Sequence, residues 1–145
     1  SDPFMDKNEV KELFYQAIKK SPNVKYFGAV YGEAKLNFLS NSQIFVLPSF
    51  YTSEAFPISI IEAMRAGNAI VVTDHHYLSK IVGNTHGKVV EIHNLIQLSQ
   101  AIEYYIQNPD LLRSTQISNM KYAMENFKLR KYCERINLLI DSNTF

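Results

Sequence analysis

Residues 44–73, IFVLPSFYTSEAFPISIIEAMRAGNAIVVT, hold two apolar runs separated by a loop and a helical pattern. The runs at 44–47 and 69–73 are continuously apolar up to their ends, which is typical of strands that helices cover on both faces. Between them, residues 57–66 predict a helix that opens at a proline and ends before a Gly-Asn pair. This order predicts a βαβ unit of a parallel sheet.

The alternation of strands and helices continues on both sides of this unit. Two further strands are predicted, at residues 24–27 and 88–92, and the first of them alternates in polarity and looks nearer an edge. Further helices are predicted over residues 8–19, 33–41, 95–107 and 109–140, the last broken near Asn126-Phe127. The pattern therefore predicts one α/β unit, a Rossmann-like parallel sheet of about four strands with helices on both faces.

Composition narrows the class of protein. The 145 residues correspond to one domain, and the 46% hydrophobic and 20% charged residues are typical of a globular chain. A net charge of +1 supplies no strong basic field, so we expect no nucleic-acid partner.

Cysteine use and hydropathy bear on the compartment. Cys133 is the single cysteine, so no internal disulfide can form and a reducing compartment is compatible with the sequence. The apolar runs are far shorter than the roughly 20 residues of a membrane helix, and the N-terminus shows no signal-peptide pattern. We expect a cytoplasmic protein, with association at the inner membrane surface left open.

Three motif types give weak signals. Residues 83–88 differ from a phosphate-binding P-loop because the spacing is one residue short and Val89 follows instead of Ser or Thr, so we predict a turn before a strand. The four histidines, which we interpret as surface-loop residues, show no metal-site spacing; they are His75, His76, His86 and His93. No paired-aspartate motif occurs, so we expect neither a protein-held metal nor another cofactor.

The loop at residues 48–57 lies where a ligand site is expected, because it follows a strand and opens a helix. Pro57 suits the first helical turn, since its missing N–H has no intrahelical partner there. The neighbouring N–H groups of Phe56, Ile58 and Ser59 remain free at this stage and, with the helix dipole, form an anion site.

Two carboxylates flank this helix start, Glu54 just before it and Glu62 in its second turn. A carboxylate accepts two hydroxyl donors at once, which suits the vicinal diol of a ribose or hexose. Glu62 lies off the apolar stripe of the helix, beside the small Ser59 and Ala66. The alternative stays open that Glu62 is a solvated helix residue and Glu54 a charge favoured by the helix dipole.

The same loop resembles the signature of family-four retaining glycosyltransferases of the GT-B architecture. In that signature a Pro-Ser ends a strand, and two glutamates separated by seven residues follow; here these are Pro48-Ser49, Glu54 and Glu62. Further stretches are similar to the family in order, namely Ala66-Gly67, residues 69–74, residues 23–30, Gly87 to Val90 and Asn108-Pro109. The resemblance covers nearly the whole chain and implies the donor-binding C-terminal domain of such an enzyme.

The resemblance implies roles for individual residues. Glu62 would accept the ribose hydroxyls of a UDP- or GDP-sugar, and Glu54 would position the transferred sugar. The backbone of Ala55, Phe56, Pro57, Ile58 and Ser59 would face the sugar and the diphosphate, with no donor at the proline. Gly28, Ala29, Val30 and Lys35 would contact the base. The implied reaction transfers a hexose with retention to a saccharide or lipid-linked acceptor, in polysaccharide or glycolipid synthesis, without a metal.

Parts of the family pattern are missing from residues 1–145. The family's C-terminal domain begins with two further strands and a Gly-Arg and Lys clamp for the diphosphate, and an N-terminal domain binds the acceptor. We therefore expect a partial domain that is inactive alone. Without the two strands, a gap of roughly 14 Å would separate the first predicted strand from the others, so an oligomer, a partner chain, upstream residues or a different strand pairing is expected to close it.

Two other functions remain as alternatives. A non-catalytic interaction module would keep the fold and dock partners through Tyr104, Tyr105 and Tyr122, although helix core and rim is the simpler interpretation of these tyrosines. A related enzyme such as a sugar-nucleotide epimerase or a glycogen synthase would share the site.

Overall fold

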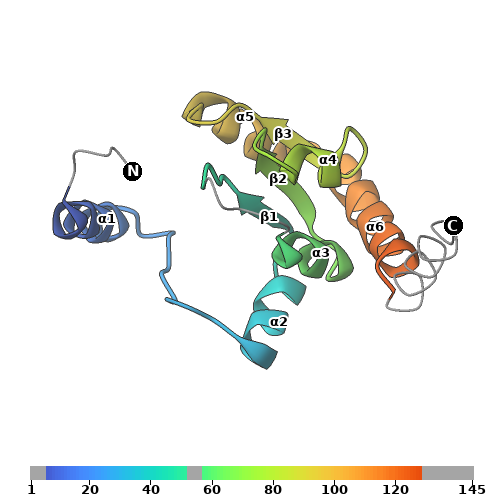
Figure 1. Ribbon diagram of the computed structural model, residues 1–145, viewed down its shortest axis with the longest axis horizontal. Helices are drawn as coiled ribbons and strands as arrows, with labels where there is room; N and C mark the ends of the chain where they lie inside the picture. The colour runs from blue at the N-terminus through green and yellow to red at the C-terminus, as the bar shows by residue number, and fades with distance from the viewer. Residues whose placement is uncertain (1–5, 52–56, 129–145) are drawn as a thin grey trace, which may run out of the picture. The chain divides into compact units, whose positions relative to one another are not determined.

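The structure, a computed structural model, describes residues 6–51 and 57–128 of the chain (Figure 1). It divides into two compact units, Ser1–Tyr31 and Gly32–Phe145, each of which is described by itself. In the N-terminal unit, α1 (Lys7–Lys20) confirms the helix predicted at 8–19. Its Phe14 ring packs edge-on against Tyr26, with centroids 5.1 Å apart.

The prediction of a strand at residues 24–27 is wrong. These residues have no regular secondary structure, and Val24, Tyr26 and Phe27 are 53%, 55% and 58% exposed. A strand depends on a neighbour for its backbone hydrogen bonds, and the sheet that the described residues form takes all its strands from the larger unit. The strand was predicted from the aromatic and β-branched side chains of this segment. One of them, Tyr26, packs on α1 instead.

The larger unit contains a three-stranded parallel sheet. Its strands are β1 (Ile44–Leu47), β2 (Ala69–Thr73) and β3 (Gly87–Val90), in the order β1-β2-β3. The predicted bounds of β1 and β2 are confirmed, while β3 starts one residue before the predicted 88 and ends two residues before the predicted 92. The α/β class with a parallel sheet is thus confirmed, with three strands among the described residues in place of about four.

Helices connect and cover these strands. They are α2 (Gly32–Ser40), α3 (Ile58–Arg65), α4 (Leu78–Val82), α5 (Leu95–Gln107) and α6 (Pro109–Asn126). All except α4 were predicted, because a helix of five residues is too short to show a helical period. The predicted break at Asn126-Phe127 is confirmed by the end of α6; the residues predicted as helical after 128 lie outside the described part.

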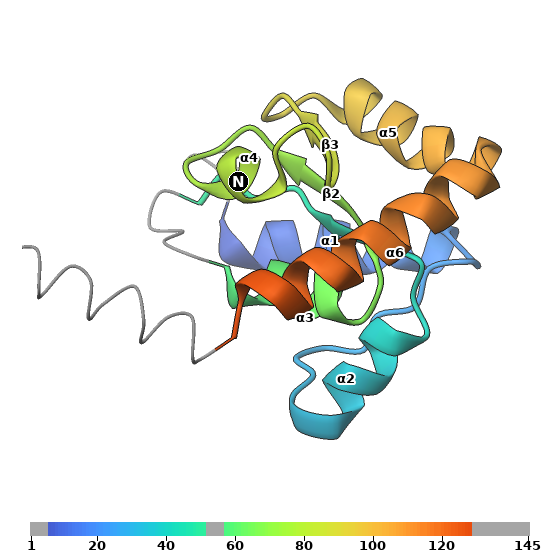
Figure 2. The same ribbon diagram turned by 90° about the vertical axis from the view of Figure 1, so that its right-hand side faces the viewer.

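Strand β2 organises the core by alternation. Ile70 and Val72 lie in one apolar cluster with residues of α3 and α4, and Ala69 and Val71 lie in a second with residues of α5. Both views place α5 above the strands and α3 below them (Figures 1 and 2). Helices therefore cover both faces of the sheet, as predicted. The β1 residues are half-buried, unlike β2, because β1 is an edge strand of the described sheet.

Candidate functional site

Glu62 is positioned by the way α3 packs on the sheet. Ile60, Ala63 and Met64 form the fully buried stripe of this helix. Glu62 lies off that stripe, and its side chain is 27% exposed. The carboxylate is therefore accessible to a ligand from a helix that the core holds in place.

Lys35 of α2 is the direct partner of this carboxylate. Its Nζ donates to both oxygens of Glu62, at 2.8 Å to Oε1 and 2.9 Å to Oε2. The Lys35 side chain is 38% exposed, so the pair is at the surface but partly shielded from water. Glu62 is thus one half of an interhelical ion pair, and the structure brings two of the candidate site residues together.

The start of α3 is ordered around Pro57. This residue is buried, and its carbonyl accepts the N–H of Ile60 at 3.1 Å. The N–H groups of Ile58 and Ser59 precede this first bond, where a helix offers donors without intrahelical partners. Ile58 is 66% exposed. These two N–H groups could therefore face an anionic ligand.

The structure does not place the other predicted site residues relative to Glu62. Glu54, Ala55 and Phe56 lie outside the described residues. Gly28, Ala29 and Val30 belong to the N-terminal unit. Their predicted contacts with the sugar, the diphosphate and the base stay predictions.

Two side chains at the end of β2 hold the loop that enters the site. The Thr73 hydroxyl donates to the carbonyl of Ser49, and the carbonyl of Tyr51 accepts from Nε2 of His75 at 3.0 Å. The backbone before residue 52 is thereby fixed to the central strand. Sequence reasoning missed this role, because the two partners are 24 positions apart in each case.

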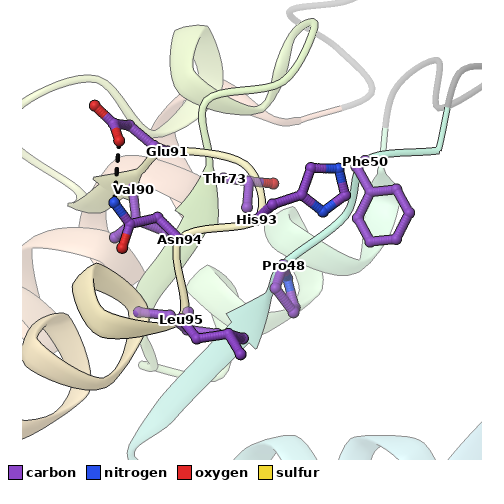
Figure 3. Close-up of a pocket in the computed structure, with 9 residues that line it drawn as sticks. Pro48, Phe50, Thr73, Val90, Glu91, His93, Asn94 and Leu95 are labelled. Atoms are coloured by element: carbon purple, nitrogen blue, oxygen red, sulfur yellow. Dashed lines mark hydrogen bonds between the residues drawn. The ribbon is translucent and has the colours of Figure 1, made fainter. Parts of the chain in front are cut away.

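A small apolar cavity of about 190 Å³ lies over the carboxyl ends of the three strands (Figure 3). Its lining comes from the ends of all three strands and the start of α5, namely Pro48, Phe50, Thr73, Val90, Glu91, His93, Asn94, Leu95 and Leu98. The polar groups at its rim are engaged with one another, since Asn94 Nδ2 donates to Glu91 Oε2 at 3.0 Å. The ring of His93 packs on Phe50 with centroids 4.5 Å apart.

The weak motifs have structural roles in the described residues. Segment 83–88 leads from helix α4 into strand β3, the reverse of the strand-loop-helix order of a P-loop, which confirms the predicted turn. A Cβ at Gly87 would overlap the carbonyl oxygen of Ile70 and lie 2.8 Å from Cγ1 of Val82. Glycine is therefore required there by the close approach of β2 and α4.

Of the four predicted surface-loop histidines, His86 packs against α6. The Nδ1 atom of His86 lies 3.1 Å from Oδ1 of Asn119, and its ring stacks on Tyr122 at 3.9 Å. His86 is thus a packed, half-buried residue, contrary to the prediction of a surface-loop histidine. In the part of the chain that the structure describes, no cluster of three or more His, Cys, Asp or Glu side chains could hold a metal.

The tyrosines occupy the helix core and rim. Tyr105 is 2% exposed and Tyr104 is 42% exposed. Burial raises the pKa of Tyr105 above its ordinary value, an effect that a hydrogen bond with Thr115 partly offsets. Tyr105 is accordingly a core residue and is not available as part of a docking face.

Residues 6–123 match the protein family described as glycosyl transferases group 1. The chain belongs to this family. The resemblance seen in the loop at residues 48–67 is thereby confirmed.

A curated relative of this glycosyltransferase comes from Campylobacter jejuni subsp. jejuni serotype O:2. It is N,N'-diacetylbacillosaminyl-diphospho-undecaprenol alpha-1,3-N-acetylgalactosaminyltransferase, 36% identical over 89 residues, which are 61% of this chain and 23% of the relative. Among solved structures, sucrose-phosphate synthase from Thermosynechococcus elongatus is similar in fold, with a TM-score of 0.79 at 21% identity. That match covers 98% of this chain and 36% of the synthase. The chain therefore spans 23% of the relative and 36% of the synthase.

The described helices of this glycosyltransferase include none that is long and apolar enough to cross a membrane.

Proposed function

We propose that this chain binds the nucleotide diphosphate sugar of a glycosyltransferase, and that Glu62 accepts the ribose hydroxyls. The observation that carries the proposal is the Glu62 carboxylate, which is 27% exposed on a helix whose Ile60, Ala63 and Met64 are buried. A carboxylate can accept two hydroxyls at once, which suits the vicinal diol of a ribose. Its second-turn position puts it near the free N–H groups at the start of α3.

The anionic part of the donor is proposed to lie at that helix start. The N–H groups of Ile58 and Ser59 and the helix dipole favour a diphosphate there. The hydrogen bonds of Thr73 and His75 fix the chain that leads to Glu54. We propose that Glu54 positions the hydroxyls of the transferred sugar.

This arrangement would stabilise the transition state by positioning the donor sugar and by neutralising the negative charge of the departing diphosphate. As the bond from the anomeric carbon to the diphosphate breaks, the carbon gains oxocarbenium character and the leaving group gains negative charge. Backbone donors at the helix start would stabilise that charge. We propose hexose transfer with retention and without a protein-held metal, in keeping with a sequence that contains no paired-aspartate motif.

The acceptor belongs to the whole protein. The name of the Campylobacter jejuni relative gives a diphospho-undecaprenol acceptor and an N-acetylgalactosaminyl group. We propose, by likeness to it, a saccharide or lipid-linked acceptor in polysaccharide or glycolipid synthesis, bound outside these residues, with the enzyme in the cytoplasm at the inner membrane surface. The chain alone is then expected to bind donor without transferring sugar.

Calorimetric titration of UDP, GDP and their sugars into the chain tests the proposal and identifies the base. We expect one of the two nucleotides to bind with one site per chain. A folded chain that binds none of these compounds would contradict the proposed donor site in these residues.

A further inference from the structure

Lys35 occupies both acceptor atoms that a ribose would need. Its single ammonium group lies 2.8 Å from Oε1 and 2.9 Å from Oε2 of Glu62, so it uses the inward-facing lone pairs of the two oxygens. The remaining lone pairs point away from each other. A vicinal diol cannot reach both oxygens from those directions while the ammonium stays between them.

We infer that Lys35, in place of the base contact that the resemblance implies for it, is an internal competitor of the ribose and lowers the affinity of the site for nucleosides. In the nucleotide-free chain the ammonium takes the place of the two hydroxyls on Glu62. When a nucleoside binds, its two ribose hydroxyls replace the Lys35 ammonium as the donors to Glu62. The inference rests on the proposed role of Glu62.

Breaking the Lys35–Glu62 ion pair costs little free energy, so a bound nucleoside can displace the ammonium reversibly. The side chains of Lys35 and Glu62 are 38% and 27% exposed, and an exposed ion pair changes an equilibrium by no more than about fivefold. Lysine carries its charge on a flexible four-carbon chain, so the ammonium can leave without movement of α2. The same pair orients the Glu62 carboxylate while no donor is bound.

Nucleosides carry the ribose but no phosphate, so their binding reports the competition between Lys35 and the ribose without a contribution from phosphate. We would titrate uridine and guanosine into the chain by NMR, using the wild type, Lys35→Met and Lys121→Met, the last a control at an exposed position of α6. Lys35→Met should bind the nucleoside about two- to fivefold more tightly than wild type, and Lys121→Met should match wild type. Raising the salt concentration should tighten nucleoside binding to the wild type, because salt weakens the ion pair, and should leave Lys35→Met unchanged.

Failure of this inference is distinguishable from failure of the proposed function. If Lys35→Met binds the nucleoside as weakly as wild type or more weakly, while Glu62→Gln abolishes binding, the competition is disproved and the role of Glu62 stands. If no nucleoside or nucleotide binds, or Glu62→Gln binds like wild type, both proposals fall. Amide spectra of each variant check the fold, and Lys35→Gln replaces Lys35→Met if the latter unfolds.

Discussion

At the scale of single residues, Asn119 makes contacts that join three segments. Its Nδ2 donates to the carbonyls of Asn68 at 2.9 Å and His86 at 2.8 Å. Asn119 and Asn68 are both fully buried, and Asn68 Nδ2 in turn donates to the carbonyls of Leu39 and Ser42. These amides link the ends of α2 and α3 to α6 and the start of β3, and so help to hold α2 and α3 beside each other.

We predict that Asn119→Ala lowers the free energy of unfolding by about 2 kcal/mol or more, because two buried carbonyls lose their donor and each costs about 1–3 kcal/mol. Urea denaturation measures the change. Ser118→Ala, at an exposed neighbouring position of α6, should stay within about 0.5 kcal/mol of wild type. Equal stability of the two variants would show that the buried amide network contributes little.

At the scale of elements, prediction succeeded where a local pattern and the tertiary environment agree. The strand at 69–73 and the helix at 95–107 are present with the predicted bounds, because continuous burial and a helical period mark them. The prediction of a strand at residues 24–27 failed because a strand needs a neighbouring strand to pair with, and no local pattern reveals one. Glu62 was predicted as a site residue from the neighbouring loop, and this role stays a prediction. Its pairing with Lys35, 27 positions away, depends on the packing of α2 on α3, which no local pattern reveals.

The loop between β1 and α3 depends on its anchor at the end of β2. Thr73 is 3% exposed and its hydroxyl donates to the Ser49 carbonyl. We predict that Thr73→Val lowers the free energy of unfolding by about 0.5–1.5 kcal/mol and weakens donor binding, because the loop start is released. Chemical denaturation and calorimetric titration with the donor measure the two effects. Binding at wild-type strength by a measurably destabilised Thr73→Val variant would show that the anchor does not serve the site.

At the scale of the whole molecule, the edge of the sheet is the main feature. Among the described residues β1 pairs with β2 alone, so its other edge presents backbone groups that can pair with another strand. The chain spans 23% and 36% of two proteins it matches. The proposal of an oligomer or partner chain that completes the sheet is directed at this edge.

We predict that the chain associates with itself in solution through this edge. Size-exclusion chromatography with light scattering should give a mass above the 16.7 kDa of a single chain, rising with protein concentration. A mass of one chain at every concentration would contradict association through β1.

The central claim is that Glu62 accepts the ribose of a nucleotide, and one comparison tests it most directly. The affinity for UDP or GDP, whichever binds, should fall by about 10- to 150-fold in Glu62→Gln, because hydrogen bonds to a charged acceptor contribute about 1.5–3 kcal/mol. Glu103→Gln, at an exposed position of α5, is the matched control and should bind like wild type. Equal affinities of Glu62→Gln, Glu103→Gln and wild type would contradict the account.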